Sequence, residues 1–74
     1  MNIKIGDTVL CRFGTAKIEG LILTSGPGVA SGDSVSAVGI ESVKAGKVVF
    51  DLDIGKWQWS HQIKAINGVS ISRL

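Results

Sequence analysis

The chain has 74 residues, one cysteine, one histidine and a net charge of +2. These numbers exclude an internal disulfide and a Cys/His zinc site, and the length predicts one domain. The mild positive charge permits a nucleic-acid partner without requiring one, because the lysines and arginines are scattered along the chain. We therefore expect a single small domain over residues 1–74 with no bound metal.

Hydrophobic residues make up 45% of the chain, although a domain of this size encloses only a small core. Small domains usually gain stability from disulfides, a metal or partner subunits, and only partner subunits remain here. We therefore expect a homo-oligomer. The first seven residues contain no apolar stretch typical of a signal peptide, and no segment predicts a membrane span. A single reduced cysteine is typical of a cytoplasmic protein, so we expect that location and no membrane partner.

Alternation with period two and frequent glycines predict short β-strands throughout. Residues 8–13 form the first predicted strand, with one face made of Val9, Cys11 and Phe13. A turn at Gly14 precedes a second strand over residues 16–23, in which Ile18 and Ile22 are expected on one face. Gly20, in the middle of that strand, predicts a bend or a bulge.

The middle of the chain allows two topologies. Residues 24–33 have loop composition, and residues 34–43 are compatible with a further strand. If a strand at 47–53 pairs directly with 16–23, residues 24–46 form one long insertion. If 34–43 is a barrel strand instead, the 24–33 loop lies at the opposite end of the molecule.

The C-terminal third has the clearest pattern. Residues 47–53 alternate, with Val48, Phe50 and Leu52 on one face, and a tight reversal leads into a strand at 57–60. The sequence then predicts a single helical or irregular turn at 60–62, a strand at 63–66 and a hairpin turn at Asn67-Gly68. No window has helical periodicity of useful length. The predicted fold is all-β, a small, strongly bent, partly open five- to six-stranded barrel of SH3-like or Sm-like type.

The sequence does not predict an enzyme. A nucleophile requires a positioned base, and Cys11 lies in mid-strand where a small buried hydrophobic residue is expected. Asp51 and Asp53 are expected on one face of a strand and could form a carboxylate pair, but a solvated strand end explains them more simply. We predict no catalytic residue, no metal ligand and no cofactor.

Trp57-Gln58-Trp59 is the most informative segment. Trp57, Trp59 and His61 point to the same side if the strand continues that far. The two rings could fill the core or a subunit interface, stack nucleic-acid bases, or bind a proline-rich peptide. In the topology with one long insertion, Lys44 and Lys47 approach His61. The candidate nucleic-acid-binding residues are Lys44, Lys47, Trp57, Trp59, His61 and Gln62.

Two segments resemble the motifs of the Sm/Sm-like family. Residues 5–14 and 18–21 resemble its first motif, in which an alternating strand precedes a turn glycine and a bent strand with a central glycine. Residues 59–63, with Ile66, resemble its second motif, usually Arg-Gly-Asn-Asn-Val/Ile. The opening at residues 6–9 is also similar to SH3-like, Tudor and KOW modules, and the chain looks similar to small phage-encoded Sm-like proteins.

This resemblance implies a bent five-stranded barrel, a ring of subunits joined strand to strand, and single-stranded RNA bound by the loops after the second and fourth strands. The chain departs from the family because it lacks the N-terminal helix and the Asp-x-x-x-Asn signature. Trp59 and Ser60 stand where the second motif has Arg and Gly. RNA contacts would therefore fall on Trp59, Ser60, His61 and Gln62.

Our leading hypothesis is a non-catalytic, ring-forming Sm-like barrel that binds RNA or another single-stranded nucleic acid. The first rival is an SH3/Tudor-like protein-interaction or structural module that belongs to a phage particle or a regulatory complex. A second rival is an enzyme or metal-binding accessory protein that uses Asp51 and Asp53.

Overall fold

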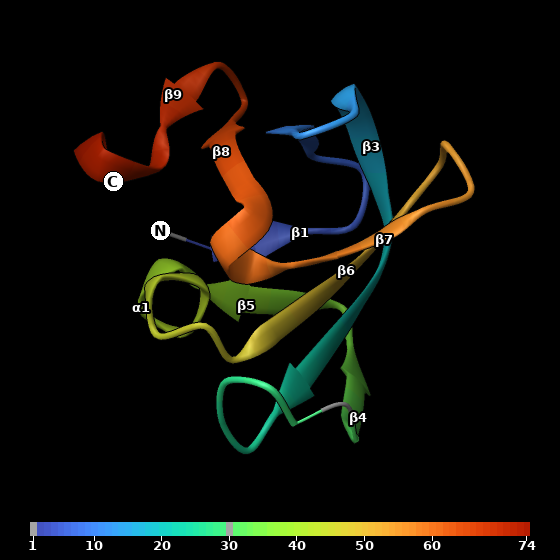
Figure 1. The fold of residues 1–74 in the computed structure, drawn as a ribbon, viewed down its shortest axis with the longest axis vertical. Helices are drawn as coiled ribbons and strands as arrows, with labels where there is room; N and C mark the ends of the chain where they lie inside the picture. The colour runs from blue at the N-terminus through green and yellow to red at the C-terminus, as the bar shows by residue number, and fades with distance from the viewer. Residues whose placement is uncertain (1, 30) are drawn as a thin grey trace.

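The structure is a computed structural model that describes residues 2–29 and 31–74; Met1, and Ala30 in the predicted 24–33 loop, lie outside them. The strands are β1 (Asn2–Lys4), β2 (Thr8–Cys11), β3 (Gly14–Thr24), β4 (Gly32–Val35), β5 (Ala37–Gly39), β6 (Val48–Leu52), β7 (Trp57–Trp59), β8 (Ile63–Ile66) and β9 (Val69–Ser70) (Figure 1). One short helix, α1 (Ile40–Lys44), and two 3-10 turns, η1 (Ser60–Gln62) and η2 (Ile71–Arg73), complete the described part. The predicted mostly-β fold is confirmed.

The strands form two antiparallel sheets. The larger has the order β7-β6-β3-β2-β8-β9, with β4 also paired to β3, and the smaller pairs β1 with β5. Over the residues that the structure covers, these sheets do not close into a barrel, since β7 and β9 end the path. In the described part, no helix is both long and apolar enough to cross a membrane.

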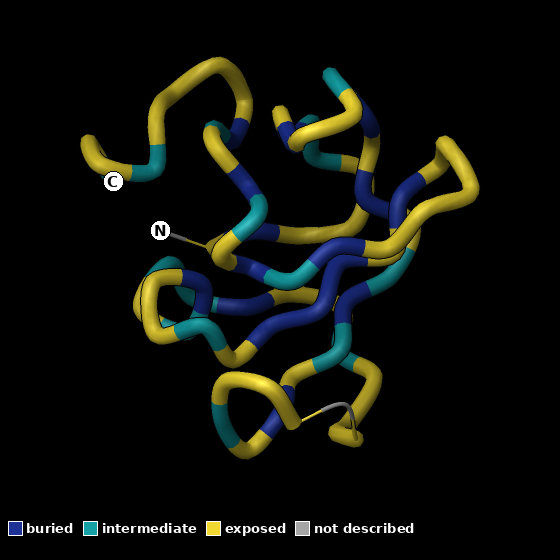
Figure 2. The backbone as a smooth tube through the Cα atoms, in the orientation of Figure 1, coloured by how far each residue is buried: buried dark blue, intermediate teal, exposed yellow. Residues whose placement is uncertain are grey.

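The core follows the alternation of the strands, and Figure 2 shows its buried residues on the central strands with exposed loops around them. Val48, Phe50 and Leu52 face inward from β6, as predicted. Large side chains that are almost fully enclosed are Ile3, Val9, Ile18, Leu21, Val48, Phe50, Leu52 and Ile66. On the other side of β6, Asp51 is exposed and Val49 is 8% exposed.

A bulge in β3 decides which of its residues face outward. The register with β6 shifts between Ile18 and Gly20, which confirms the predicted bend or bulge. The extra residue puts Ile18 and Leu21 in the core and turns Ile22 to the other face. The prediction that Ile18 and Ile22 share a face is therefore wrong, because it assumed an uninterrupted pleat.

The first predicted strand ends earlier than expected. β2 stops at Cys11, and Phe13 is 50% exposed whereas Val9 and Cys11 are buried, so the prediction that the three share one face of a strand is wrong. Gly14 adopts φ +101°, and this tight turn swings Phe13 outward. Its ring instead lies below two cations, with the Arg12 guanidinium carbon 5.3 Å and the Lys56 ammonium 5.5 Å from the ring centre.

The topology with one long insertion is the one observed, because β6 pairs directly with β3. A single strand over residues 34–43 is wrong: the segment is divided among β4, β5 and α1. β4 pairs with the second edge of β3, and β5 pairs with β1, so the insertion is itself built into the sheets. α1 has five residues, too few to produce a helical period in the sequence.

The hairpin predicted at Asn67-Gly68 is confirmed. Asn67 has φ +50° and Gly68 has φ +82°, the positive values that a tight hairpin turn needs, and β8 pairs with β9 across it. The Asn67 side chain also ties the turn to β2, because its Oδ1 accepts a hydrogen bond from the Thr8 N–H at 3.1 Å. The chain after residue 68 therefore folds back on its own sheet.

Asp7 fixes the turn between β1 and β2. Its carboxylate accepts hydrogen bonds from the Lys4 main-chain N–H at 3.0 Å and from the Lys4 ammonium at 3.4 Å. Burial raises the pKa of Asp7, but these hydrogen bonds and the positive charge of Lys4 outweigh it, and the pKa is lowered.

Candidate binding face on β3, β6 and β7

The outward sides of three neighbouring strands form one continuous surface. Val49 pairs with Trp59 and Asp51 with Trp57 across β6 and β7, while on the other side of β6 Val49 pairs with Ile22 and Asp51 with Gly20. Residues paired across a sheet share a face. We call this surface the outer face; it consists of Gly20, Ile22, Val49, Asp51, Trp57 and Trp59.

Neither tryptophan belongs to the hydrophobic core. Gln58, between them, faces inward and is 4% exposed, so Trp57 and Trp59 point outward together, as predicted. Trp57 is 58% exposed and Trp59 is half-buried. The interpretation of the two rings as core residues is wrong, because the tight reversal into β7 places Gln58, not a tryptophan, opposite Phe50.

Ser60 sets the end of β7 and the start of η1. Its buried hydroxyl donates to the Val48 carbonyl at 2.9 Å and accepts from the Val48 N–H at 3.1 Å. These two bonds take the place of the main-chain hydrogen bonds that would continue the β6–β7 ladder. The Trp59 N–H donates to Gln62 Oε1 at 2.9 Å. The predicted single turn at 60–62 is confirmed, and the side-chain oxygen of Gln62 holds that turn in place.

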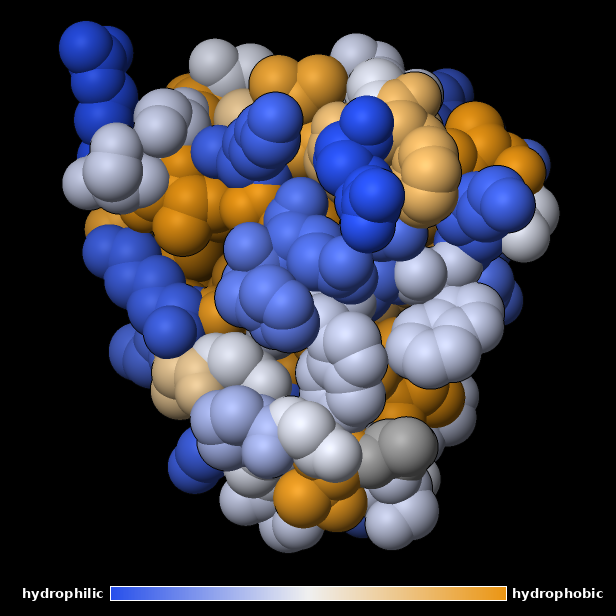
Figure 3. Space-filling model, in the orientation of Figure 1, coloured by the Kyte–Doolittle hydropathy of each residue, from blue (hydrophilic) through white to orange (hydrophobic). Residues whose placement is uncertain are grey.

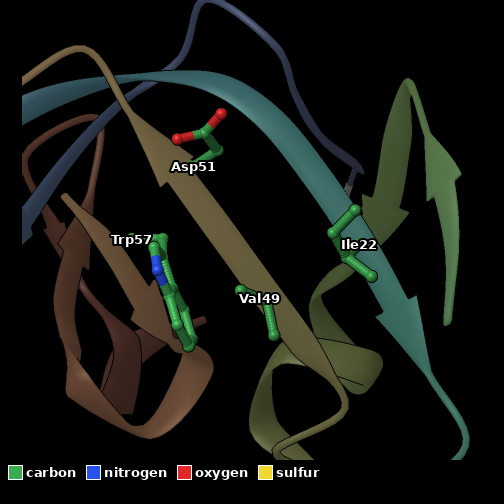
Figure 4. A pocket seen from close by; sticks show the side chains of 4 residues that line it. All are labelled: Ile22, Val49, Asp51 and Trp57. Atoms are coloured by element: carbon green, nitrogen blue, oxygen red, sulfur yellow. The ribbon is translucent and has the colours of Figure 1, made fainter. Parts of the chain in front are cut away.

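A hollow lies on the outer face beside Trp57 (Figure 4). Its volume is about 380 Å³, and it is lined by Ile22, Val49, Asp51 and Trp57. Figure 4 shows the four side chains on the same side of the three strands. Gly20 leaves room next to the carboxylate, since a Cβ at this position would lie 3.3 Å from Asp51 Cβ.

Gly20, Ile22 and Val49 were not predicted to belong to a site, and Asp51 was considered only together with Asp53. The alternation of residues 47–53 already puts Val49 and Asp51 on the face opposite the core, which is the signal that could have found them. Alternation could not assign Ile22 to this face, because the bulge in β3 changes the side to which Ile22 points.

Two of the predicted basic residues lie at the Trp59 end of the outer face. Lys47 precedes Val48 and His61 follows Ser60, so both flank the Val48–Ser60 contact, and both are exposed. α1 packs against η1 and brings Lys44 to the same end. The Lys44 ammonium, however, donates to the main-chain oxygen of Leu74 at 2.6 Å.

The carboxylates do not form the pair considered in the sequence analysis. Asp53 lies beyond the end of β6, and its Oδ1 accepts from the Lys17 N–H at 3.0 Å, whereas Asp51 stays on the outer face. Across residues 2–29 and 31–74, no three His, Cys, Asp or Glu side chains gather in a way that could hold a metal ion. Cys11 is buried, and its thiol lies 3.4 Å from the Gly14 carbonyl oxygen.

The outer edge of β7 is covered in part by the side chains of Gln58, in β7, and Gln62, in η1. The Leu52 N–H donates to the Lys56 carbonyl, so these two residues form a hydrogen-bonded pair. Hydrogen-bonded pairs recur at every second position of an antiparallel ladder, so Phe50 and Gln58 form the next one. The main-chain groups of Trp57 and Trp59 therefore face outward from the sheet. Gln58 Nε2 donates to the Trp57 carbonyl at 3.1 Å, and Gln62 accepts from Trp59. A second strand could join this edge only by displacing both glutamines.

Considerable apolar surface is exposed. Figure 3 shows hydrophobic patches scattered between hydrophilic ones on one side of the molecule. The large exposed hydrophobic residues are Ile5, Leu10, Phe13, Leu23, Val29, Ile54, Trp57 and Val69.

No protein-family model, curated protein or solved structure matches this chain.

Proposed function

We propose that this chain is a non-catalytic binding module that holds single-stranded RNA or DNA across its outer face. The observation that carries the proposal is the pair of outward-facing rings, Trp57 and Trp59, on one strand. Side chains two residues apart on a strand are about 7 Å apart, so two bases can stack in succession. Stacking of a base on an aromatic side chain contributes about 1–3 kcal/mol and tolerates any sequence.

Charge at one end of the outer face supports the same proposal. Lys47 and His61 are exposed beside Trp59 and could contact phosphates while bases lie on the rings. Lys44 lies at the same end but is already bonded to Leu74, so we assign it a secondary role. Phosphate contacts would make binding weaken as salt rises, through release of counterions.

We further propose that the fold is a partly open barrel of SH3-like or Sm-like type. Five strands, β7, β6, β3, β2 and β8, lie side by side in one sheet, and the long β3 is bent at a bulge. Strong bending at a bulge is the usual device by which a small sheet curls. This arrangement supports a partly open barrel.

The exposed apolar surface supports the proposal of a homo-oligomeric ring. A small domain gains stability by covering such surface with copies of itself. Light scattering on the purified chain at micromolar concentration tests this: a multimer is expected, and a monomer at all concentrations would overturn it.

Titration of tryptophan fluorescence with single-stranded oligonucleotides, repeated at several salt concentrations, tests nucleic-acid binding. We expect quenching at low salt and a steep loss of affinity as salt increases. Trp57→Ala should weaken binding, while Phe13→Ala, which removes an exposed ring outside the outer face, should not. An unchanged spectrum at low salt would overturn the proposal.

One observation favours a second candidate, a module that binds a segment of another protein. The charged side chain that lines the hollow is the carboxylate of Asp51, and a carboxylate repels phosphate. A basic peptide that quenched Trp57 more strongly than any oligonucleotide would favour this candidate.

A further inference from the structure

We infer that the hollow beside Trp57 reads one base of the bound strand, and that the base is guanine. The inference rests on the proposed function, since it names which part of a single strand enters the hollow. Four side chains line the hollow: three of them favour a flat apolar group, and the fourth, Asp51, accepts hydrogen bonds.

The apolar lining selects a flat, uncharged group. Ile22 and Val49 form the apolar part of the lining, and the exposed indole of Trp57 stands beside them. An indole face beside aliphatic side chains suits a planar heterocycle, which can stack on the ring. A nucleobase has this shape, and a phosphate does not.

Asp51 selects the hydrogen-bonding edge of that heterocycle. An ionised carboxylate only accepts hydrogen bonds, and it can accept two parallel ones. In the described part of the chain the one salt bridge joins Lys4 and Asp7, so no cationic side chain occupies Asp51. Its oxygens are therefore available to a ligand.

Guanine matches this acceptor better than the other bases. Its base-pairing edge carries two adjacent donors, N1–H and the N2 amino group, which can bond both oxygens of one carboxylate. Cytosine and adenine carry one amino group beside a ring acceptor. Uracil and thymine carry one N–H between two carbonyl oxygens, and a carboxylate repels these oxygens. Asp51 therefore favours guanine and disfavours uracil.

The position of Asp51 also sets the direction of the strand. The carboxylate lies opposite Trp57, whereas Lys47 and His61 lie at the Trp59 end of the outer face. Asp51 repels phosphates, whereas the Lys47 ammonium attracts them and the exposed His61 imidazole can donate a hydrogen bond to them. The guanine therefore occupies the Trp57 end, and the backbone of the strand runs toward Trp59.

Gly20 keeps the side of the hollow open. It pairs with Asp51 across the sheet, and a Cβ there would lie 3.6 Å from Asp51 Oδ2 and 3.3 Å from Asp51 Cβ. Gly20→Ala adds a methyl group beside the carboxylate. It should hinder a base that bonds to Asp51 while leaving the Trp59 end unchanged.

The test compares fluorescence-detected affinities of three heptanucleotides: heptauridine, the same strand with a central guanosine, and the same strand with a central inosine. Inosine keeps N1–H but lacks the N2 amino group. For the wild-type chain we expect the guanosine strand to bind about tenfold more tightly than heptauridine, with inosine in between. Asp51→Asn and Gly20→Ala should reduce this preference to within about twofold, whereas Asp33→Asn, an exposed carboxylate on β4, should leave it unchanged.

Two outcomes separate the inference from the proposed function. If the three strands bind equally, or if Asp51→Asn keeps the preference for guanosine, the base assignment is overturned and nucleic-acid binding stands. If no strand binds at low salt, both fall. A circular dichroism spectrum of each variant confirms that it is folded. An arginine-rich heptapeptide, added as a fourth probe, overturns the base assignment if it binds most tightly and depends on Asp51.

Discussion

Asp51 and Trp57 stand opposite each other on β6 and β7, in a pair that exchanges no main-chain hydrogen bonds. Side chains of such pairs approach more closely than those of hydrogen-bonded pairs. The result is a carboxylate and an exposed indole in one hollow, with the unoccupied side of Gly20 next to them. Both the proposed function and the assignment of guanine depend on this relationship.

Lys47→Gln tests the role of the basic end. If Lys47 contacts a phosphate, its loss should weaken binding of every oligonucleotide to a similar extent. It should also reduce the slope of log K against log salt by about 1. Lys64→Gln, which removes an exposed lysine on β8, is the matched control. Equal salt slopes for the two variants would remove Lys47 from the interface.

Ser60→Ala should destabilise the fold. The substitution leaves the N–H and carbonyl of Val48 without their partner at a buried position, which costs about 1–3 kcal/mol in the free energy of unfolding. Chemical denaturation monitored by circular dichroism measures the loss. Ser34→Ala, at an exposed position on β4, should change stability little. A Ser60 variant as stable as that control would contradict the role of the hydroxyl.

Gln58→Met should stabilise the fold. The buried Oε1 of Gln58 has no hydrogen-bond partner, and an unpaired buried acceptor costs about 1–3 kcal/mol. Methionine has a similar shape and no oxygen, although it gives up the bond to the Trp57 carbonyl. We expect a higher midpoint of thermal unfolding. A clear decrease would mean that the bond to Trp57 outweighs the unpaired oxygen.

Asp7→Asn should remove a pH-dependent contribution to stability. Because folding lowers the pKa of Asp7 below 3.8, its carboxylate stabilises the fold above that pH. The contribution is lost as pH falls through the lower folded pKa. Wild type should therefore exceed Asp7→Asn in the free energy of unfolding at pH 5 to 7, and the difference should shrink below pH 3.8. A difference that stays constant down to pH 2 would contradict this cause.

Local patterns predicted much of the fold. Alternation located β6 and its core residues, the Asn67-Gly68 pair located the β8–β9 hairpin, and Gly20 marked the bulge. These features depend on a few neighbouring residues, so the sequence contains them directly.

Long-range pairing could not be predicted in the same way. β5 pairs with β1, which lies far away in the chain, and no local pattern specifies this partner. β4 pairs with the nearby end of β3 across residues 25–31, but its exposed residues show no alternation that would mark it as a strand. The hollow depends on such pairing too, because Ile22 reaches Val49 only after the bulge in β3 has shifted its register. Trp57 and Trp59 were recognised from the sequence, but their outward direction follows from the burial of Gln58.

The most direct test is a map of the binding surface by nuclear magnetic resonance. The ¹⁵N-labelled chain is titrated with the heptauridine strand that carries one central guanosine, at low salt. The account predicts that the largest shifts occur at the two indole N–H groups and at the amides of Ile22, Val49 and Asp51. Shifts confined to Leu10 and Phe13, or indole signals that do not move while binding occurs, would contradict it.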